Sequence, residues 1–194
     1  MTDTTPDLGP QTHVIARLAD GVTDDQLSAS TPCPDLAVRN LLGHLLGLTV
    51  AFRDAARKDL GVTTDTSPGA AVPDIGPGWR EELPKVLDEL AEAWRDPGAR
   101  TGMTRAGGLD LPAPVAVAVA VDELVIHGWD LARATGQEYA PDPAALRASH
   151  DFLLAAVGEP GRDEIFGPVV PVAADAPLLD RAVGLSGRDP GWTP

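Results

Sequence analysis

Three side chains on two distant segments have the residue types and spacing of a metal site. Glu123 and His127 are four residues apart, so on a helix they leave one face with Cβ atoms about 5–6 Å apart. His44 lies three residues after Leu41 and four before Leu48, within an apolar stripe where an imidazole needs a polar partner. Imidazole nitrogen and carboxylate oxygen suit zinc and other borderline divalent ions. Three protein ligands leave positions open for water, a thiolate or a substrate oxygen, as catalytic metal sites do.

The spacing alone also allows a simpler interpretation. Glu123 and His127 can form a pair on a solvated helix face, while His44 is a core histidine bonded to a backbone carbonyl. Asp130, one turn beyond His127, is expected to be a helix-surface carboxylate, with the alternative that it orients a metal ligand. Cys33 lies between two prolines, and we expect a small buried residue there rather than a reactive thiol or a zinc ligand.

The two remaining histidines are expected to lie outside the site. His13 precedes an apolar pair in the first predicted helix, which indicates a residue at the boundary of the core. His150 lies between a serine and an aspartate on a later predicted helix, which indicates an exposed position.

The composition disfavours several classes of function. Asp and Glu number 29 against 15 Lys and Arg, which gives a net charge of −14, and the basic residues are scattered. Nucleic acids and anionic membrane surfaces require clustered basic residues, so we expect neither as a partner. The sequence contains no Gly-x-Ser-x-Gly elbow and no phosphate-cradling glycine loop of Walker or Rossmann type, which disfavours nucleotide chemistry.

A cytoplasmic location fits the sequence best. Cys33 is the single cysteine, so an intramolecular disulfide cannot form, and a reducing compartment is indicated. The acidic N-terminus has no apolar stretch of a signal peptide. The longest apolar runs, near residues 41–52 and 111–121, are shorter than the roughly 20 residues of a membrane helix.

The elements that must position these side chains are predicted to be helices. Apolar residues at three- and four-residue spacing predict five helices, over residues 10–20, 35–58, 79–95, 143–157 and 177–186. Asp35 is the predicted cap of the second of these, and the third begins at residue 79 or 83. The Val-Ala alternation after Pro114 is typical of a strand, but the run continues to Ala134 without a breaker and Gly136 follows as a cap. We therefore predict a helix there. Residues 62–77 and 98–111 are predicted connections, the second with a short hairpin, and a brief strand is considered at 169–172.

Four substantial helices joined by long connections predict an all-α bundle, in which sites are built from side chains on facing helices. We expect a single domain over residues 1–194, made of a four-helix metal-binding bundle at 8–136 and a helical C-terminal extension at 137–194 packed on it. If the helices with His44 and with Glu123 and His127 face each other, the three side chains converge in the bundle.

Two longer motifs around these residues carry a resemblance to a known family. They are TPCPDLAVRNLLGHL at residues 31–45 and ELVIHGWDLA at residues 123–132. With these two motifs in this order, the chain resembles the mycothiol-dependent maleylpyruvate isomerase-like, metal-binding branch of the DinB superfamily. Residues 166–168 and 187–190 are similar to the tail of many members of this family. The family usually has Trp where this chain has Leu36, a departure on the approach to the second helix and not at a predicted ligand.

The resemblance implies a DinB-like four-helix bundle with a divalent metal held by His44, Glu123 and His127. The resemblance implies zinc as the expected metal, because zinc is common in the family, with Ni2+ or Fe2+ as alternatives. The resemblance also implies mycothiol, or a similar low-molecular-weight thiol, as cosubstrate for a small-molecule electrophile. A free thiol has a pKa of about 8.5, and coordination to a dication favours the nucleophilic thiolate.

The sequence therefore predicts a thiol-dependent transferase or isomerase in which the metal activates the thiol. Two alternatives stay open: a metal-dependent hydrolase, in which the ion activates water, and a non-catalytic protein that binds a metal or a small ligand. The sequence also leaves open the native metal, the substrate, a homodimeric state, and whether loop 62–77 closes over the site.

Overall fold

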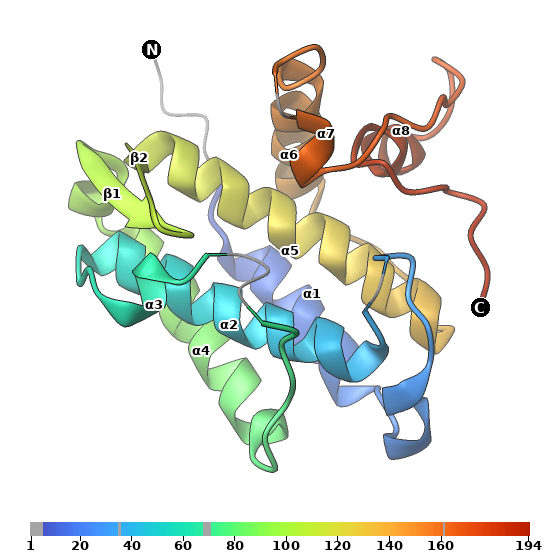
Figure 1. Ribbon diagram of the computed structural model, residues 1–194, viewed down its shortest axis with the longest axis horizontal. Helices are drawn as coiled ribbons and strands as arrows, with labels where there is room; N and C mark the ends of the chain where they lie inside the picture. The colour runs from blue at the N-terminus through green and yellow to red at the C-terminus, as the bar shows by residue number, and fades with distance from the viewer. Residues whose placement is uncertain (1–5, 35, 68–70, 161) are drawn as a thin grey trace.

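The computed structural model describes residues 6–34, 36–67, 71–160 and 162–194, which form a mostly helical fold (Figure 1). The longer helices are α1 (Gly9–Asp20), α2 (Val38–Arg57), α4 (Trp79–Arg95), α5 (Ala113–Thr135) and α6 (Pro143–Ala155). The shorter elements are the helices α3 (Val62–Asp65), α7 (Arg162–Ile165) and α8 (Leu178–Leu185), the 3-10 turns η1 (Asp24–Ser28) and η2 (Pro97–Arg100), and the strands β1 (Met103–Ala106) and β2 (Leu109–Pro112). The all-α class predicted from the sequence is confirmed.

Four of the helices pack in a closed ring. Helix α4 contacts α1 and α2, and α5 contacts α2 and α1. The apolar core fills the ring and includes the fully buried side chains of Leu41, Leu45, Leu90, Trp94 and Leu124. Helix α6 packs on α5 and α8 packs on α6, on the side of α5 away from α2 (Figure 1).

The Val-Ala alternation at the start of α5 forms a helix, as predicted. The buried residues Ala116, Val117, Ala120 and Val121 follow the spacing of one helix face, not the alternation of a strand. Gly136 follows α5 with a φ of 67°, in the left-handed region that favours glycine. Helical continuity therefore extends through the segment that carries Glu123 and His127.

The connections contain more structure than predicted. The predicted loop 62–77 begins with helix α3, whose Asp65 pairs with Arg105 of β1 at 3.0 Å. The hairpin predicted within residues 98–111 is present as the antiparallel pair β1–β2. Helix α3 is not predicted because four residues are too few to show a helical period.

Two other sequence predictions concern the strand at 169–172 and the cap of α2. The strand considered at 169–172 is wrong: within the described part of the chain this segment has no strand, and Val170 N donates to Gly184 O at 3.0 Å instead. The predicted cap of α2 at Asp35 lies outside the described residues. Among the helices in the described ranges, none has the length and apolar character needed to cross a bilayer.

Hydrogen bonds to the backbone of α5 fix its rotation in the ring. Gln11 Nε2 on α1 donates to Leu124 O and to the Tyr139 hydroxyl, both at 3.1 Å, and that hydroxyl donates to Val125 O at 2.6 Å. Burial raises the pKa of Tyr139 above its usual range, so the hydroxyl keeps its proton. Leu124 and Val125 lie between the two predicted ligands of α5, so these bonds set the direction of the ligand-bearing face.

Replacing Tyr139 by phenylalanine is expected to lower the free energy of unfolding by roughly 1–2 kcal/mol, because a buried carbonyl and amide lose a partner. Urea denaturation measures this change. The control is Glu138→Gln, a neighbouring exposed position, which should leave the unfolding midpoint unchanged. Equal midpoints for Tyr139→Phe and the control would show that these bonds do not fix α5.

Candidate metal centre

His44 of α2 and Glu123 and His127 of α5 meet where the two helices pack together. Glu123 Oε2 lies 3.3 Å from His44 Nε2 and 3.0 Å from His127 Nε2. The two imidazoles are edge to face, with ring centroids 4.7 Å apart and planes at 85°. Ligand atoms of all three residues lie within 4.8 Å of one another. The structure thus brings together the three residues predicted as metal ligands, and the metal itself stays a prediction.

The cluster is accessible from solution on one side. The side chains of His44 and Glu123 are 28% and 26% exposed, whereas that of His127 is 9% exposed. His44 lies at the edge of the apolar stripe of α2, next to the fully buried Leu41 and Leu45. A small molecule can therefore approach His44 and Glu123, while His127 lies at the base of the cluster.

Part of the predicted loop 62–77 borders the cluster. The loop backbone at Asp74 crosses α2 beside Gly43. A Cβ atom added to Gly43 would lie 2.7 Å from the backbone nitrogen of Asp74. Such an approach requires glycine, because a methyl group there would overlap the loop backbone. Arg39 pairs with Asp74 at 2.7 Å and holds the crossing in place beside His44.

The carboxylate of Glu123 faces a positive charge in the cluster, which in the metal-free protein is the proton on His127. Burial favours a neutral Glu123, but hydrogen bonds from His127 and His44 outweigh it and hold the pKa of that carboxyl well below its usual range. Burial favours a neutral His127, but hydrogen bonds to Asp130 and Glu123 outweigh it and raise its pKa to about 9. In the metal-free protein at neutral pH, His127 therefore carries a proton on both ring nitrogens. The proton on Nε2 supplies the positive charge that a metal ion would otherwise bring.

Asp130 and Arg188 form a buried layer behind His127. His127 Nδ1 lies 2.9 Å from Asp130 Oδ2, and the Asp130 side chain is 0% exposed. Arg188, in the segment after α8, donates to both carboxylate oxygens, from Nη2 at 3.1 Å and from Nε at 3.3 Å. The expectation of a helix-surface carboxylate at Asp130 is wrong, because the C-terminal segment covers α5 here. Sequence spacing gives no signal for Arg188, which lies outside every predicted helix.

Cys33 lies beside this layer. Its Sγ, a ring nitrogen of His127 and a carboxylate oxygen of Asp130 are all within 4.8 Å of one another. Burial and the charge of Asp130 raise the pKa of Cys33 to about 11, although Arg188 opposes the shift. The thiol therefore stays protonated at neutral pH and is a weak nucleophile. The side chain is only half-buried, less than the sequence predicts.

The other two histidines lie away from the cluster. His13 on α1 is an exposed residue, 3.7 Å from Asp88. The prediction of an exposed His150 is wrong: it is 6% exposed, and its Nε2 lies 3.0 Å from Arg181 Nη2. Helix α8, which carries Arg181, packs on α6 and covers it. The sequence around His150 contains no sign of that distant cover.

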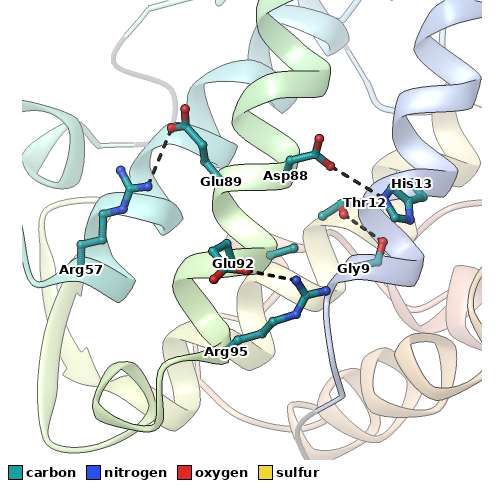
Figure 2. Close-up of a pocket in the computed structure, with 9 residues that line it drawn as sticks. Gly9, Thr12, His13, Arg57, Asp88, Glu89, Glu92 and Arg95 are labelled. Carbon is teal, nitrogen blue, oxygen red and sulfur yellow. Dashed lines mark hydrogen bonds and ion pairs between the residues drawn. The ribbon is translucent and has the colours of Figure 1, made fainter.

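A separate surface pocket lies between α1 and α4 (Figure 2). Its volume is about 400 Å³, and its lining residues are Gly9, Thr12, His13, Arg57, Asp88, Glu89, Ala91, Glu92 and Arg95. The charged side chains pair with one another, as Figure 2 shows for Arg57 with Glu89 and Arg95 with Glu92. The pocket shares no residue with the cluster of His44, Glu123 and His127. In the cluster the candidate ligand atoms converge on one point, whereas the charged groups of the pocket pair with one another.

The arrangement of the helices is that of a DinB-like helical fold. The family model of the mycothiol maleylpyruvate isomerase N-terminal domain matches residues 8–132, and the chain belongs to this family. Arg188 lies beyond the matched residues.

The chain is also similar to two curated proteins and to two solved structures. Two uncharacterized proteins of Mycobacterium tuberculosis, from strains CDC 1551 / Oshkosh and ATCC 25618 / H37Rv, are each 26% identical over 182 residues, which covers 89% of this chain and 91% of each relative. The crystal structure of the mycothiol-dependent maleylpyruvate isomerase aligns with a TM-score of 0.50 at 18% identity, over 75% of this chain and 66% of that chain. A histidine-to-alanine mutant of that isomerase gives the same values. At this identity the structural match supports the fold alone.

Proposed function

We propose that the protein is a divalent-metal-dependent enzyme that uses a low-molecular-weight thiol of the mycothiol type. His44, Glu123 and His127 would hold the ion. The observation that carries this proposal is the convergence of their ligand atoms within 4.8 Å. The choice of thiol is supported by the matched family and by the solved isomerase, both of which are named for mycothiol. Zinc is the proposed metal because two imidazoles and one carboxylate form a common catalytic zinc set, with Ni2+ and Fe2+ as alternatives.

The residues of the cluster have separate tasks in this proposal. A bound dication would favour the thiolate form of a coordinated thiol, which is the nucleophilic form. Glu123 and His44, each about a quarter exposed, leave the solvent side open for the thiol and an electrophilic small molecule. His127 is held from behind by Asp130. The reaction proposed is the addition of the thiolate to an electrophilic carbon. In an isomerisation, bond rotation is followed by elimination of the same thiolate, so the C–S bond breaks again. In a transfer, the C–S bond stays, a leaving group such as chloride departs, and the conjugate is released.

We also propose that residues 1–194 form one domain, in which the extension 137–194 packs on the bundle 8–136. The contacts of α6 with α5 and of Arg188 with Asp130 support this division. The proposed location is the cytoplasm, where a low-molecular-weight thiol is reduced.

The proposed activity is tested by turnover of the zinc-loaded protein with maleylpyruvate and with chlorodinitrobenzene, a general electrophile, each with and without mycothiol. We expect product only when both the thiol and the metal are present. Glu123→Gln should lose at least about 100-fold, since removal of a charged ligand should cost more than the roughly 10–100-fold of a residue that only orients one. Glu92→Gln is the matched control, since this exposed carboxylate lies in the separate pocket. Equal formation of a hydrolysed product without thiol would indicate a hydrolase, and bound metal without any turnover would indicate a non-catalytic binding protein.

A further inference from the structure

We propose that Asp130 and Arg188 are positioning residues for the metal centre. Arg188 would hold Asp130 in place, and Asp130 would fix the orientation and the tautomer of His127. This inference rests on the proposed function, because it concerns how the metal ligands are prepared. It assigns a role to the C-terminal segment, which lies beyond the family match at residues 8–132.

The first step is the bond between His127 and Asp130. A carboxylate can only accept hydrogen bonds, so the 2.9 Å contact places the imidazole proton on Nδ1 of His127. When the imidazole is neutral, Nε2 is then the nitrogen with a free lone pair. That nitrogen faces Glu123 at 3.0 Å. Asp130 therefore selects the tautomer of His127 that can bind a cation beside Glu123.

The second step is the pairing of Asp130 with Arg188. A fully buried carboxylate is costly unless a charged partner compensates it. Arg188 supplies two donors in a fork, one to each oxygen of Asp130. Its third nitrogen, Nη1, donates to Ser186 O at 3.0 Å, which ties the guanidinium to its own segment. With both oxygens held, Asp130 cannot rotate away from His127.

The chain offers a matched control for the contribution of Arg188. Arg133 on α5 also anchors the C-terminal segment, since its Nη2 donates to Trp192 O at 2.6 Å and to Pro190 O at 3.4 Å. These bonds involve neither Asp130 nor His127. Arg133→Met therefore loosens the same segment without touching the ligand layer, whereas Arg188→Met removes the fork on Asp130.

The test measures the zinc dissociation constant by chelator competition and the proton resonance of His127 Nδ1–H by NMR, in both metal-free and zinc-loaded protein. We expect Asp130→Asn and Arg188→Met to weaken zinc binding about 10–100-fold, and Arg133→Met to leave it unchanged. The downfield Nδ1–H resonance should disappear in Asp130→Asn and exchange faster with water in Arg188→Met. Arg188→Lys, which keeps the charge without the fork, should recover part of the affinity.

The outcomes separate positioning from simple anchoring. Equal zinc affinity for Arg188→Met and Arg133→Met, with an unchanged Nδ1–H resonance in both, would overturn the inference. If Arg188→Met does not fold, Arg188→Lys is compared with Arg133→Met in the same way. If the wild-type protein binds no zinc, the proposed function fails, but the resonance in the metal-free variants still decides whether Arg188 and Asp130 hold His127.

Discussion

Replacing His127 by alanine is expected to remove bound metal almost completely. The change deletes one of the three proposed ligand atoms and leaves Asp130 and Arg188 facing the vacated space. The loss should exceed the roughly 10–100-fold effect typical of a residue that only orients a ligand. His44→Ala should have a similar effect, because His44 is the ligand proposed from α2, where its Nε2 lies 3.3 Å from Glu123 Oε2.

Elemental analysis of protein purified without a metal-chelating tag measures this effect. The wild-type protein should contain near-stoichiometric metal, and both alanine variants should contain almost none. His13→Ala is the matched control, because His13 is exposed and lies in the separate pocket. Equal metal in the wild-type protein and all three variants would show that the cluster does not bind it.

Zinc affinity is expected to rise with pH until about pH 9. In the metal-free protein, hydrogen bonds to Asp130 and Glu123 raise the pKa of His127 to about 9 against the opposing effect of burial, so zinc must displace the proton on Nε2. Displacement of one proton makes the affinity increase about tenfold for each pH unit below that pKa. Between pH 7 and pH 9 the total gain is therefore about 50-fold, because half of His127 is still protonated at its pKa, and above pH 9 the contribution of His127 levels off.

Chelator competition at several pH values measures the slope, and calorimetry in two buffers with different ionisation enthalpies measures proton release. We expect about one proton released per zinc bound at pH 7. A dissociation constant that is constant from pH 7 to pH 9 would contradict the protonated state of His127 in the metal-free protein.

The pKa shifts of His127 and Glu123 also affect the stability of the metal-free protein, the first in alkaline and the second in acidic solution. The pKa of His127 is raised from 6.5 to about 9 on folding, so its stabilising contribution is complete below about pH 6.5 and is lost as pH rises through about 9. The pKa of Glu123 is lowered from 4.5, so its contribution is present above about pH 4.5 and is lost in stronger acid. Between about pH 4.5 and about pH 6.5, protonated His127 and ionised Glu123 both contribute fully to the stability of the folded protein.

The sequence predicts the parts of the site that depend on local spacing. Glu123 and His127 share a face because they are four residues apart on a helix, and His44 is conspicuous within an apolar stripe. The helical form of α5 follows from its length without a breaker, even though its first residues alternate like a strand. These features require no knowledge of distant contacts.

The parts that the sequence does not predict depend on segments that meet only in the folded chain. Asp130 looks like a surface residue until Arg188, 58 positions later, covers it. His150 is hidden by α8 in the same way. Irregular segments have no hydrophobic period, so periodicity cannot show what they cover.

The cluster joins two helices whose contacting residues are 79 positions apart in the sequence. An ion held there would link α2 to α5, because it would be bound by side chains of both helices. Because such an ion binds the folded chain and not the unfolded one, occupancy and folding would reinforce each other through mass action. The side chains proposed for the chemistry would then also help to maintain the architecture around them.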